Sequence, residues 1–262
     1  MIVIDNIHKY FGGFKAVDGT SLEIKKNSIT GLIGPNGAGK TTLFNVIAGI
    51  YKPTSGKVYL DNEDITDLPP HKLFEKGVLR TFQIPHEFST MSVMENLMMV
   101  PGSQTGEKLF NTWFNTSKIS DEEKEIKSKA IEVTKFLTID HLLYEKAGNL
   151  SGGQKKLLEL GRTMMVDAKI VLLDEVGAGV NRTLLKTIGD AILRLNKERG
   201  YTFCMIEHDM DFITKLCDPV IVLAEGKVLA EGKIADIKQN EEVIEAYLGK
   251  GMKNAPKRNE YN

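Results

Sequence analysis

The chain of 262 residues has two cysteines, one tryptophan and no long apolar run. Cys204 and Cys217 stand isolated and form no C-x-x-C pair, so we expect neither a disulfide framework nor a zinc site, and we interpret both as buried small hydrophobic residues in a reducing compartment. No segment approaches the roughly 20 apolar residues of a membrane span, and residues 1–5 lack the basic and apolar regions of a signal peptide. We therefore expect a cytoplasmic protein whose role at a membrane is peripheral.

An excess of charge of either sign is also lacking. The chain carries 34 basic and 35 acidic residues, a formal net charge of −1. This balance gives no reason to expect a nucleic-acid partner. With 42% hydrophobic and 26% charged residues the chain has the composition of a globular protein, long enough for one large α/β domain or for two lobes.

A glycine-rich segment carries the strongest motif. Residues 34–41 read Gly-Pro-Asn-Gly-Ala-Gly-Lys-Thr and match the phosphate-loop pattern G-x-x-x-x-G-K-[ST], between an expected strand over 29–33 and an expected helix over 41–48. The glycines allow backbone N–H groups to converge on phosphate oxygens, and the following helix N-terminus also attracts anions. We expect Lys40 to reach the β- and γ-phosphates and the Thr41 hydroxyl to bind Mg²⁺. The alternative, a ligand-free turn, does not account for the full match in this setting.

The hydrophobic pattern predicts one α/β core that is interrupted by helices. Short apolar clusters at 2–4, 21–24 and 58–60 indicate a small antiparallel sheet. After residue 151, helices and strands alternate in the order helix 154–166, strand 170–173, helix 184–199, strand 202–206, helix 209–216 and strand 220–223. We accordingly divide the chain into the small sheet with the first part of the core, a helical subdomain, the second part of the core and a frayed tail, at 1–91, 92–150, 151–249 and 250–262.

Two details of the helical subdomain are predicted from local sequence. Ser120 and Glu123 have the spacing of a capping box at the start of its second helix. The preceding polar stretch 101–119 is interpreted as a loop with a short helix, in which Trp113 anchors the packing.

Two adjacent carboxylates follow the apolar strand 170–173. Open α/β sheets bind ligands at the carboxyl ends of their strands, which is where Asp174 and Glu175 would lie. We expect Asp174 to hold Mg²⁺ through water and Glu175 to polarise the water that attacks the γ-phosphate. Such a pair taken alone is commonly a solvated turn, but the phosphate loop in the same chain favours the functional interpretation.

The pentapeptide Leu150-Ser151-Gly152-Gly153-Gln154 resembles the signature motif of ATP-binding cassette ATPases, which binds the γ-phosphate of ATP held by a partner subunit. A glycine-rich helix N-cap is the alternative for the pentapeptide alone. Its position between the phosphate loop and Asp174-Glu175 favours the resemblance. The resemblance covers nearly the whole chain and implies an α/β fold with a P-loop NTPase (RecA-like) core, a small antiparallel β subdomain and an inserted helical subdomain.

The resemblance also implies roles for single residues. Gln83 is similar to the family's Q-loop glutamine, His208 to its switch histidine and Phe11 to the aromatic residue that stacks on adenine, with Tyr10 as the alternative. The implied catalytic residues are Glu175, His208 and Gln83, and the implied metal-binding residues are Thr41, Gln83 and Asp174. The implied ATP contacts are Phe11, Val17, Asn36, Gly37, Ala38, Gly39, Lys40, Thr41, Thr42, Ser151, Gly152, Gly153 and Gln154.

Two positions depart from the family pattern. The family has proline after the catalytic glutamate, where this chain has Val176, and ends its D-loop in aspartate, where this chain has Asn181. Proline fixes φ and removes an N–H, so Val176 loosens the backbone beside Glu175. Because both carboxylates and His208 remain, we expect an active ATPase with an altered rate. A regulatory ATP binder without turnover is the alternative.

Further segments are similar to the branched-chain amino-acid importer branch of the family. They are 80–83, 109–111, 178–181, 230–232 and 243–249. The resemblance implies a head-to-tail dimer, with itself or a paralogue, that sandwiches two ATP molecules and drives a membrane permease at the inner face of the cell membrane, supplied indirectly by a solute-binding protein. Urea import and lipopolysaccharide export stay open. An ATP-gated structural clamp of the DNA-repair or chromosome type would need a long coiled-coil insert or a DNA-binding domain, for which the roughly 60 residues between Ser92 and Leu150 are too few.

The segment after Gln83 is where the resemblance places the permease contact. Ile84, Pro85 and Phe88 are apolar residues at the expected hinge between the core and the helical insert. A groove lined by such residues suits a short helix of a partner. The alternative is that Phe88 seals the insert against the core.

Overall fold

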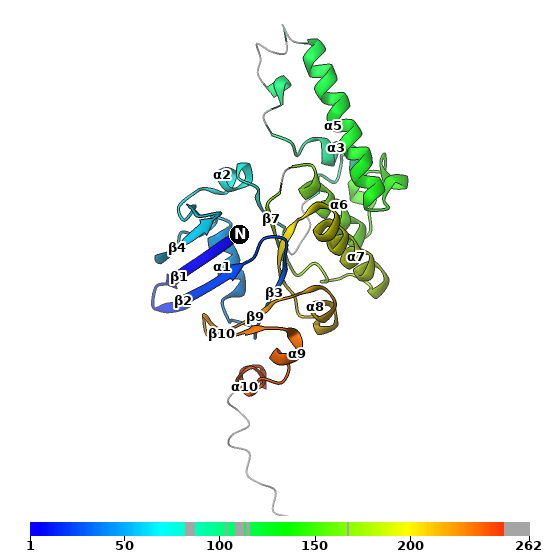
Figure 1. Cartoon of the computed structure of the whole chain (residues 1–262). Coiled ribbons are helices and arrows are strands. Elements are labelled where there is room, and N and C mark those ends of the chain that lie inside the picture. The colour runs from blue at the N-terminus through cyan, green and yellow to red at the C-terminus, as the bar shows by residue number, and fades with distance from the viewer. Residues whose placement is uncertain (82–86, 103, 108–112, 114–115, 167, 249–262) are drawn as a thin grey trace, which may run out of the picture. The chain divides into compact units, whose positions relative to one another are not determined.

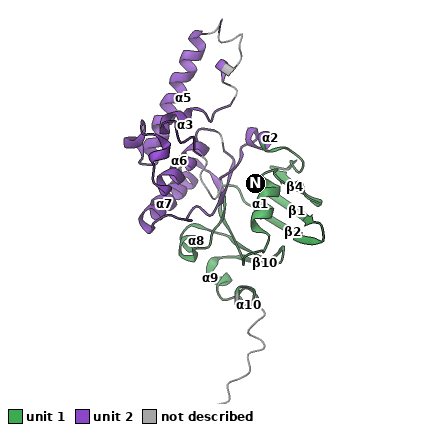
Figure 2. Ribbon diagram, turned by 180° about the vertical axis from the view of Figure 1, so that it is seen from behind, with its two compact units in different colours: residues 1–70, 204–262 green, residues 71–203 purple. Residues whose placement is uncertain are grey.

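The computed structural model describes residues 1–81, 87–102, 104–107, 113, 116–166 and 168–248. The expected tail 250–262 lies outside them. The chain forms two compact units (Figure 2). The first unit comprises residues 1–70 and 204–262, so it is assembled from the two ends of the sequence, whereas the second unit is the continuous segment 71–203.

An antiparallel sheet of four strands in the order β2-β1-β4-β5 lies in the first unit (Figure 1). Its strands are β1 Ile2–Phe11, β2 Phe14–Ile24, β4 Ser55–Leu60 and β5 Glu63–Asp64. The predicted small antiparallel sheet is confirmed, but β1 and β2 are longer than the apolar clusters suggested. Pairing from Ile2 with Ile24 to Phe11 with Phe14 continues through polar residues because backbone groups, not apolar side chains, make the ladder.

A second sheet has the strand order β10-β9-β3-β8 in the first unit and β8-β7-β6 in the second unit, and β8 contributes residues to both units. Strand β3 pairs in parallel with β9, and β6 with β7, whereas the mixed-sequence strand β10 pairs antiparallel with β9. The strands are β3 Ile29–Ile33, β6 Val78–Arg80, β7 Ile170–Asp174, β8 Thr202–Ile206, β9 Val220–Ala224 and β10 Lys227–Gly232. Every residue of β3, β7 and β8 is buried, as expected for parallel strands covered on both faces.

The helices predicted over 41–48, 154–166, 184–199 and 209–216 are present, and several short helices were not predicted. The first unit contains α1 Lys40–Ile47, α8 Met210–Leu216, α9 Ile234–Ile237 and α10 Glu241–Leu248. The α-helices α2 Pro70–Glu75, α3 Val93–Met98, α5 Thr116–Phe136, α6 Gly152–Met164 and α7 Arg182–Arg199 follow in the middle of the chain, with short 3₁₀ turns at Thr105–Glu107, Asp140–Leu142 and Ala147–Asn149. Within the described residues, no helix is both long and apolar enough to cross a membrane.

Two expectations for the helical segment are wrong. Helix α5 begins at Thr116, so Ser120 and Glu123 lie inside it and form no capping box at its start. No glycine or proline stands between Thr116 and Ser120, and an exposed serine inside a helix costs only a few tenths of a kcal/mol. Trp113 is 82% exposed, so it does not anchor the packing of the residues that the structure describes. The buried residues of α5 lie in its C-terminal half, away from the beginning of the helix that follows Trp113.

Both cysteines are buried and free, as predicted. Burial raises the pKa of both thiols, that of Cys217 to about 12. Neither forms a thiolate near neutral pH, so they act as small hydrophobic residues of the first unit.

Candidate nucleotide site

The phosphate loop connects β3 to α1 in the first unit, and its glycines serve two purposes. A Cβ at Gly34 would overlap the Leu223 carbonyl oxygen, and one at Gly39 would overlap that of Ala16, so these two positions require glycine for close backbone packing. Gly37 has a φ of 80°, and a Cβ added there would meet no heavy atom of the described residues within 4 Å. The middle of the loop therefore borders open space that a phosphate group fits.

Lys40 and the N-terminus of α1 provide positive charge at the phosphate loop. The Lys40 side chain is buried, and its Nζ donates to the carbonyl oxygens of Gly34 at 2.7 Å and Pro35 at 3.0 Å. The N-cap of α1 is Gly39 in a left-handed conformation, and it provides no side-chain cap. The helix thus begins with N–H groups that a side chain does not cap, beside a buried ammonium group, which suits an anion.

The hairpin between β9 and β10, distant in the sequence, is hydrogen-bonded to the phosphate loop. Gly226, in the turn between β9 and β10, donates its N–H to the Ala38 carbonyl at 3.1 Å. Its own carbonyl accepts from Asp18 N–H at 2.9 Å and from the Thr20 hydroxyl at 2.6 Å. Gly226 has a φ of 75°, which favours glycine. Sequence reasoning missed this residue, and the turn Glu225-Gly226-Lys227 after an apolar strand was the available signal.

The two candidates for adenine stacking face opposite sides of β1, as neighbours on a strand do. Phe11 is 44% exposed and lies edge to face against Tyr51, with ring centroids 5.4 Å apart. Tyr10 instead donates its hydroxyl to Asp18 at 2.8 Å, and this hydrogen bond lowers the pKa of the Asp18 carboxyl. Val17 is fully buried. Phe11 is thus half exposed, with Lys9 Nζ 5.1 Å from its ring centroid, whereas the Tyr10 hydroxyl is engaged with Asp18.

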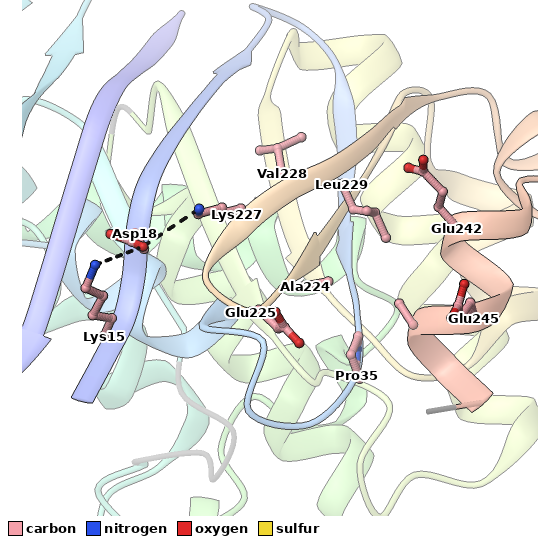
Figure 3. A pocket seen from close by; sticks show the side chains of 11 residues that line it. Lys15, Asp18, Pro35, Ala224, Glu225, Lys227, Val228, Leu229, Glu242 and Glu245 are labelled. Atoms are coloured by element: carbon pink, nitrogen blue, oxygen red, sulfur yellow. Dashed lines mark hydrogen bonds and ion pairs between the residues drawn. The ribbon is translucent and has the colours of Figure 1, made fainter. Parts of the chain in front are cut away.

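A pocket of about 820 Å³ flanks the phosphate loop (Figure 3). Asp18 lies between Lys15 at 3.4 Å and Lys227 at 3.8 Å. The remaining lining residues are Pro35, Ala224, Glu225, Val228, Leu229, Glu242, Glu245 and Ala246. The acidic side chains make this pocket a poor phosphate site. It is instead the space between the loop, the hairpin and α10, where Tyr247 has a hydrogen bond with the Gly34 backbone.

The expected carboxylates end strand β7 in the second unit. Asp174 is buried and forms an ion pair with Arg80 at the end of β6, with 2.8 Å between Nη2 and Oδ2. Glu175 has a φ of 50°, a left-handed conformation uncommon outside glycine, and this sharp turn directs it away from the line of the strand. Sequence reasoning did not assign Arg80 to the site, although a charged residue after the apolar Val78-Leu79 was a signal.

The signature pentapeptide forms the start of α6. Ser151 is the N-cap of α6 and forms a capping box with Gln154. The Ser151 hydroxyl accepts from the Gln154 N–H, and the Gln154 side chain accepts from the Ser151 N–H. A Cβ at Gly153 would overlap the Leu184 side chain, whereas one at Gly152 would meet only the Gly179 carbonyl at 3.9 Å. Packing against Leu184 therefore explains why residue 153 is glycine. Among the described residues, no comparable contact explains the exposed Gly152.

Asn181 stands where the family has aspartate, and the structure explains why this change is tolerated. Its side chain caps α7 by accepting from the Leu184 N–H at 2.9 Å. Asparagine and aspartate cap helices about equally well. The departure therefore preserves the local structure of the D-loop position.

The remaining expected residues divide between the units. His208 is exposed directly after β8 in the first unit, and its N–H lies 3.4 Å from the Glu207 carboxylate. Asn36 and Thr41 are exposed in the same unit, and Thr42 is half-buried. Gln83 lies outside the described residues. The first unit thus brings together the phosphate loop and the Gly226 hairpin and also contains Phe11, and the second unit brings together Asp174 with Arg80 and the signature with the segment that Asn181 caps.

A glycine loop between a parallel strand and a helix, with carboxylates ending another strand, defines a P-loop ATPase core. Residues 17–178 match the family model described as ABC transporter, and residues 227–252 match the one described as branched-chain amino acid ATP-binding cassette transporter. The chain belongs to the ATP-binding cassette transporter family and is an ATP-binding, ATP-hydrolysing subunit.

Individual relatives agree with this assignment. The "probable branched-chain amino acid transport ATP-binding protein LivG" of Archaeoglobus fulgidus is 44% identical over 244 residues, 93% of each chain. Among solved structures, a nucleotide-free ATP-binding cassette from an ABC transporter is 40% identical, with a TM-score of 0.82 and coverage of 95% of this chain and 99% of that chain. The ADP conformation of an ATP-binding cassette is also 40% identical, with a TM-score of 0.81 and coverage of 95% and 98%.

Proposed function

We propose that this chain powers the import of branched-chain amino acids. The observation that carries the proposal is the match of residues 227–252 to the family model of that branch, in a chain of which 93% is similar to a transport subunit named for these substrates. The matched segment includes all of β10 and α10, which border the pocket beside the phosphate loop. The part that distinguishes the branch therefore lies next to the part that binds nucleotide.

The experiment is to purify the full-length chain from membranes with its permease and to reconstitute the complex in vesicles with the solute-binding protein. We expect leucine, isoleucine or valine to stimulate ATP hydrolysis and to enter the vesicles, and urea to do neither. Stimulation by urea, or by lipopolysaccharide without any amino acid, would reassign the substrate.

The proposed reaction is ATP hydrolysis with the expected residues in distinct roles. Lys40 and the N–H groups at the start of α1 orient the β- and γ-phosphates. Glu175 accepts the proton of the attacking water, with His208 and Gln83 beside the γ-phosphate. The oxygen donors Thr41, Asp174 and Gln83 suit Mg²⁺, a hard cation that prefers oxygen ligands. When bound, Mg²⁺ would neutralise charge on the β- and γ-phosphates.

We also propose that the site is completed by a second ATPase subunit, a copy of this chain or a paralogue. The exposed Gly152 at the start of α6 supports this arrangement, because none of the residues that the structure describes packs closely enough against it to require its small size. In a head-to-tail dimer the residues of the signature, Ser151 to Gln154, would lie over the γ-phosphate held by the partner's phosphate loop. The adenine would stack on Phe11, whose ring is half exposed.

The permease is proposed to dock at Phe88, which places the subunit at the cytoplasmic face of the membrane. Phe88 is 46% exposed, so it does not seal a hydrophobic core as the alternative interpretation required. Its backbone is fixed instead, because the buried Asn96 accepts from its N–H at 2.9 Å and donates to its carbonyl at 3.1 Å. A fixed backbone that presents an exposed aromatic ring suits a contact with a partner helix.

A further inference from the structure

Arg80 and Asp174 form a buried ion pair inside the second unit. Their side chains are only 9% and 7% exposed, and Nη2 of Arg80 lies 2.8 Å from Oδ2 of Asp174. The two residues end adjacent parallel strands, in which Arg80 pairs in register with Leu172. The Thr81 N–H continues the ladder to the Leu172 carbonyl at 2.9 Å. The backbone therefore holds both members of the pair on a rigid sheet rather than on loops.

The choice of arginine has a geometric consequence for the carboxylate. A buried carboxylate needs a charged or hydrogen-bonding partner, and guanidinium provides donors in a fixed plane, whereas an ammonium group is a point charge. A carboxylate accepts hydrogen bonds at both oxygens. Holding Oδ2 from the side of β6 therefore sets the direction in which Oδ1 of Asp174 points.

We propose that Arg80 is a positioning residue for the divalent cation of the ATPase, acting by orienting the Asp174 carboxylate. This inference rests on the proposed function, in which Asp174 takes part in Mg²⁺ binding through water. Arg80 contacts neither nucleotide nor metal in this arrangement. Residues that orient a metal-binding group commonly change metal affinity about 10- to 100-fold when they are replaced.

The test measures metal binding without hydrolysis. Mn²⁺ is titrated into the full-length chain with saturating ADP, and bound Mn²⁺ is followed by electron paramagnetic resonance. Binding of a fluorescent ADP analogue in excess EDTA reports the metal-independent part of the site. The variants are Arg80→Met, Arg80→Lys, Asp174→Asn and the double variant Arg80→Met with Asp174→Asn.

We expect Arg80→Met to raise the Mn²⁺ concentration at half-saturation about 10-fold or more, without changing the affinity for ADP in EDTA. Arg80→Lys should give a smaller shift, because it retains the charge but not the planar fork. The double variant should match Asp174→Asn, since Arg80 acts only through Asp174. An unchanged half-saturation in Arg80→Met, an equal loss of metal-free ADP binding, or additive effects in the double variant would overturn the inference.

Two controls separate the possible failures. If Arg80→Met does not fold, as judged by circular dichroism, Arg80→Lys decides, and an unshifted Mn²⁺ half-saturation in this variant overturns the inference. If Asp174→Asn itself leaves Mn²⁺ binding unchanged, the metal site of the proposed function is wrong, and the inference falls with it. A shift in Asp174→Asn without one in Arg80→Met or Arg80→Lys contradicts the role of Arg80 alone.

Discussion

Lys40 is a buried cation that donates to backbone carbonyls of its own loop. Its charge near open space at Gly37 is best explained by phosphate groups, to which an ammonium group makes strong charge-assisted hydrogen bonds.

We predict that Lys40→Ala weakens ATP binding by at least about 100-fold, because two or more charge-assisted hydrogen bonds of roughly 1.5–3 kcal/mol each are lost. Isothermal titration calorimetry with ATP would measure the loss, and Lys15→Ala, on the flanking pocket, is the matched control. ATP affinity equal to that of the unchanged chain would exclude Lys40 from the phosphate site.

Glu175 is the residue proposed as general base. Its left-handed backbone conformation turns it away from the line of β7, which ends at Asp174. We predict that Glu175→Gln binds ATP with unchanged affinity but hydrolyses it about 10²- to 10⁴-fold more slowly, because an amide cannot accept the proton. Single-turnover hydrolysis beside equilibrium ATP binding tests this. A rate within about twofold of the original would assign the base elsewhere.

At the scale of elements, the start of α6 contains two adjacent glycines with different surroundings. Gly153 is in close contact with Leu184 of α7, whereas a Cβ at the exposed Gly152 would have only an ordinary contact with the Gly179 carbonyl oxygen, at 3.9 Å, among the described residues. The two positions therefore separate packing within the chain from contact with a partner.

We predict that Gly153→Ala lowers the free energy of unfolding by roughly 1–3 kcal/mol, as overpacking does, and that Gly152→Ala changes it by less than about 0.5 kcal/mol. Gly152→Ala should instead reduce steady-state ATP turnover, because the added methyl group would face the partner's nucleotide. Urea denaturation and ATPase assays on both variants decide the matter, and a stable Gly152→Ala variant with full turnover would remove the reason to place a partner there.

The elements that were predicted well from the sequence have strong local patterns. The strand 29–33 with its loop, and the strand ending at Asp174, combine an apolar run with a motif whose residues adjoin one another. The extent of β1, the support of Ala38 by Gly226 and the pairing of Arg80 with Asp174 were not predicted. Each depends on hydrogen bonds or ion pairs between segments distant in sequence, which local periodicity does not encode. The start of α5 was predicted wrongly for the opposite reason. A local capping pattern is present at Ser120, but no glycine or proline between Thr116 and Ser120 prevents the helix from beginning earlier, at Thr116.

At the scale of the whole molecule, the proposed site is incomplete in one chain. We predict that Glu175→Gln with ATP doubles in mass in solution, because the retained γ-phosphate would bridge Lys40 of one subunit and Ser151 of the other. Light scattering with ATP and with ADP measures this, and adding Ser151→Arg should abolish the change. A mass that is the same with both nucleotides would contradict the sandwich arrangement.

Coupling to a permease is a second property of the assembly. We predict that Phe88→Ala lowers the free energy of unfolding by less than about 2 kcal/mol, since a fully buried phenylalanine costs 3–5 kcal/mol and this one is 46% exposed. The isolated subunit should keep its ATPase rate, while transport in reconstituted vesicles should fall at least about tenfold. A large loss of stability, or undiminished transport, would rule out docking through Phe88.

The hydrogen bond from Gly226 to Ala38 has a consequence for the newly made chain. The ribosome completes residues 71–203 as one continuous stretch, whereas the unit that holds the phosphate loop needs residues from both ends of the sequence. At a translation rate of about 5–20 residues per second, the Gly226 turn is synthesised roughly 10–40 s after the phosphate loop. During translation, then, the nucleotide-binding loop is made early, whereas the Gly226 turn that is hydrogen-bonded to it is made late.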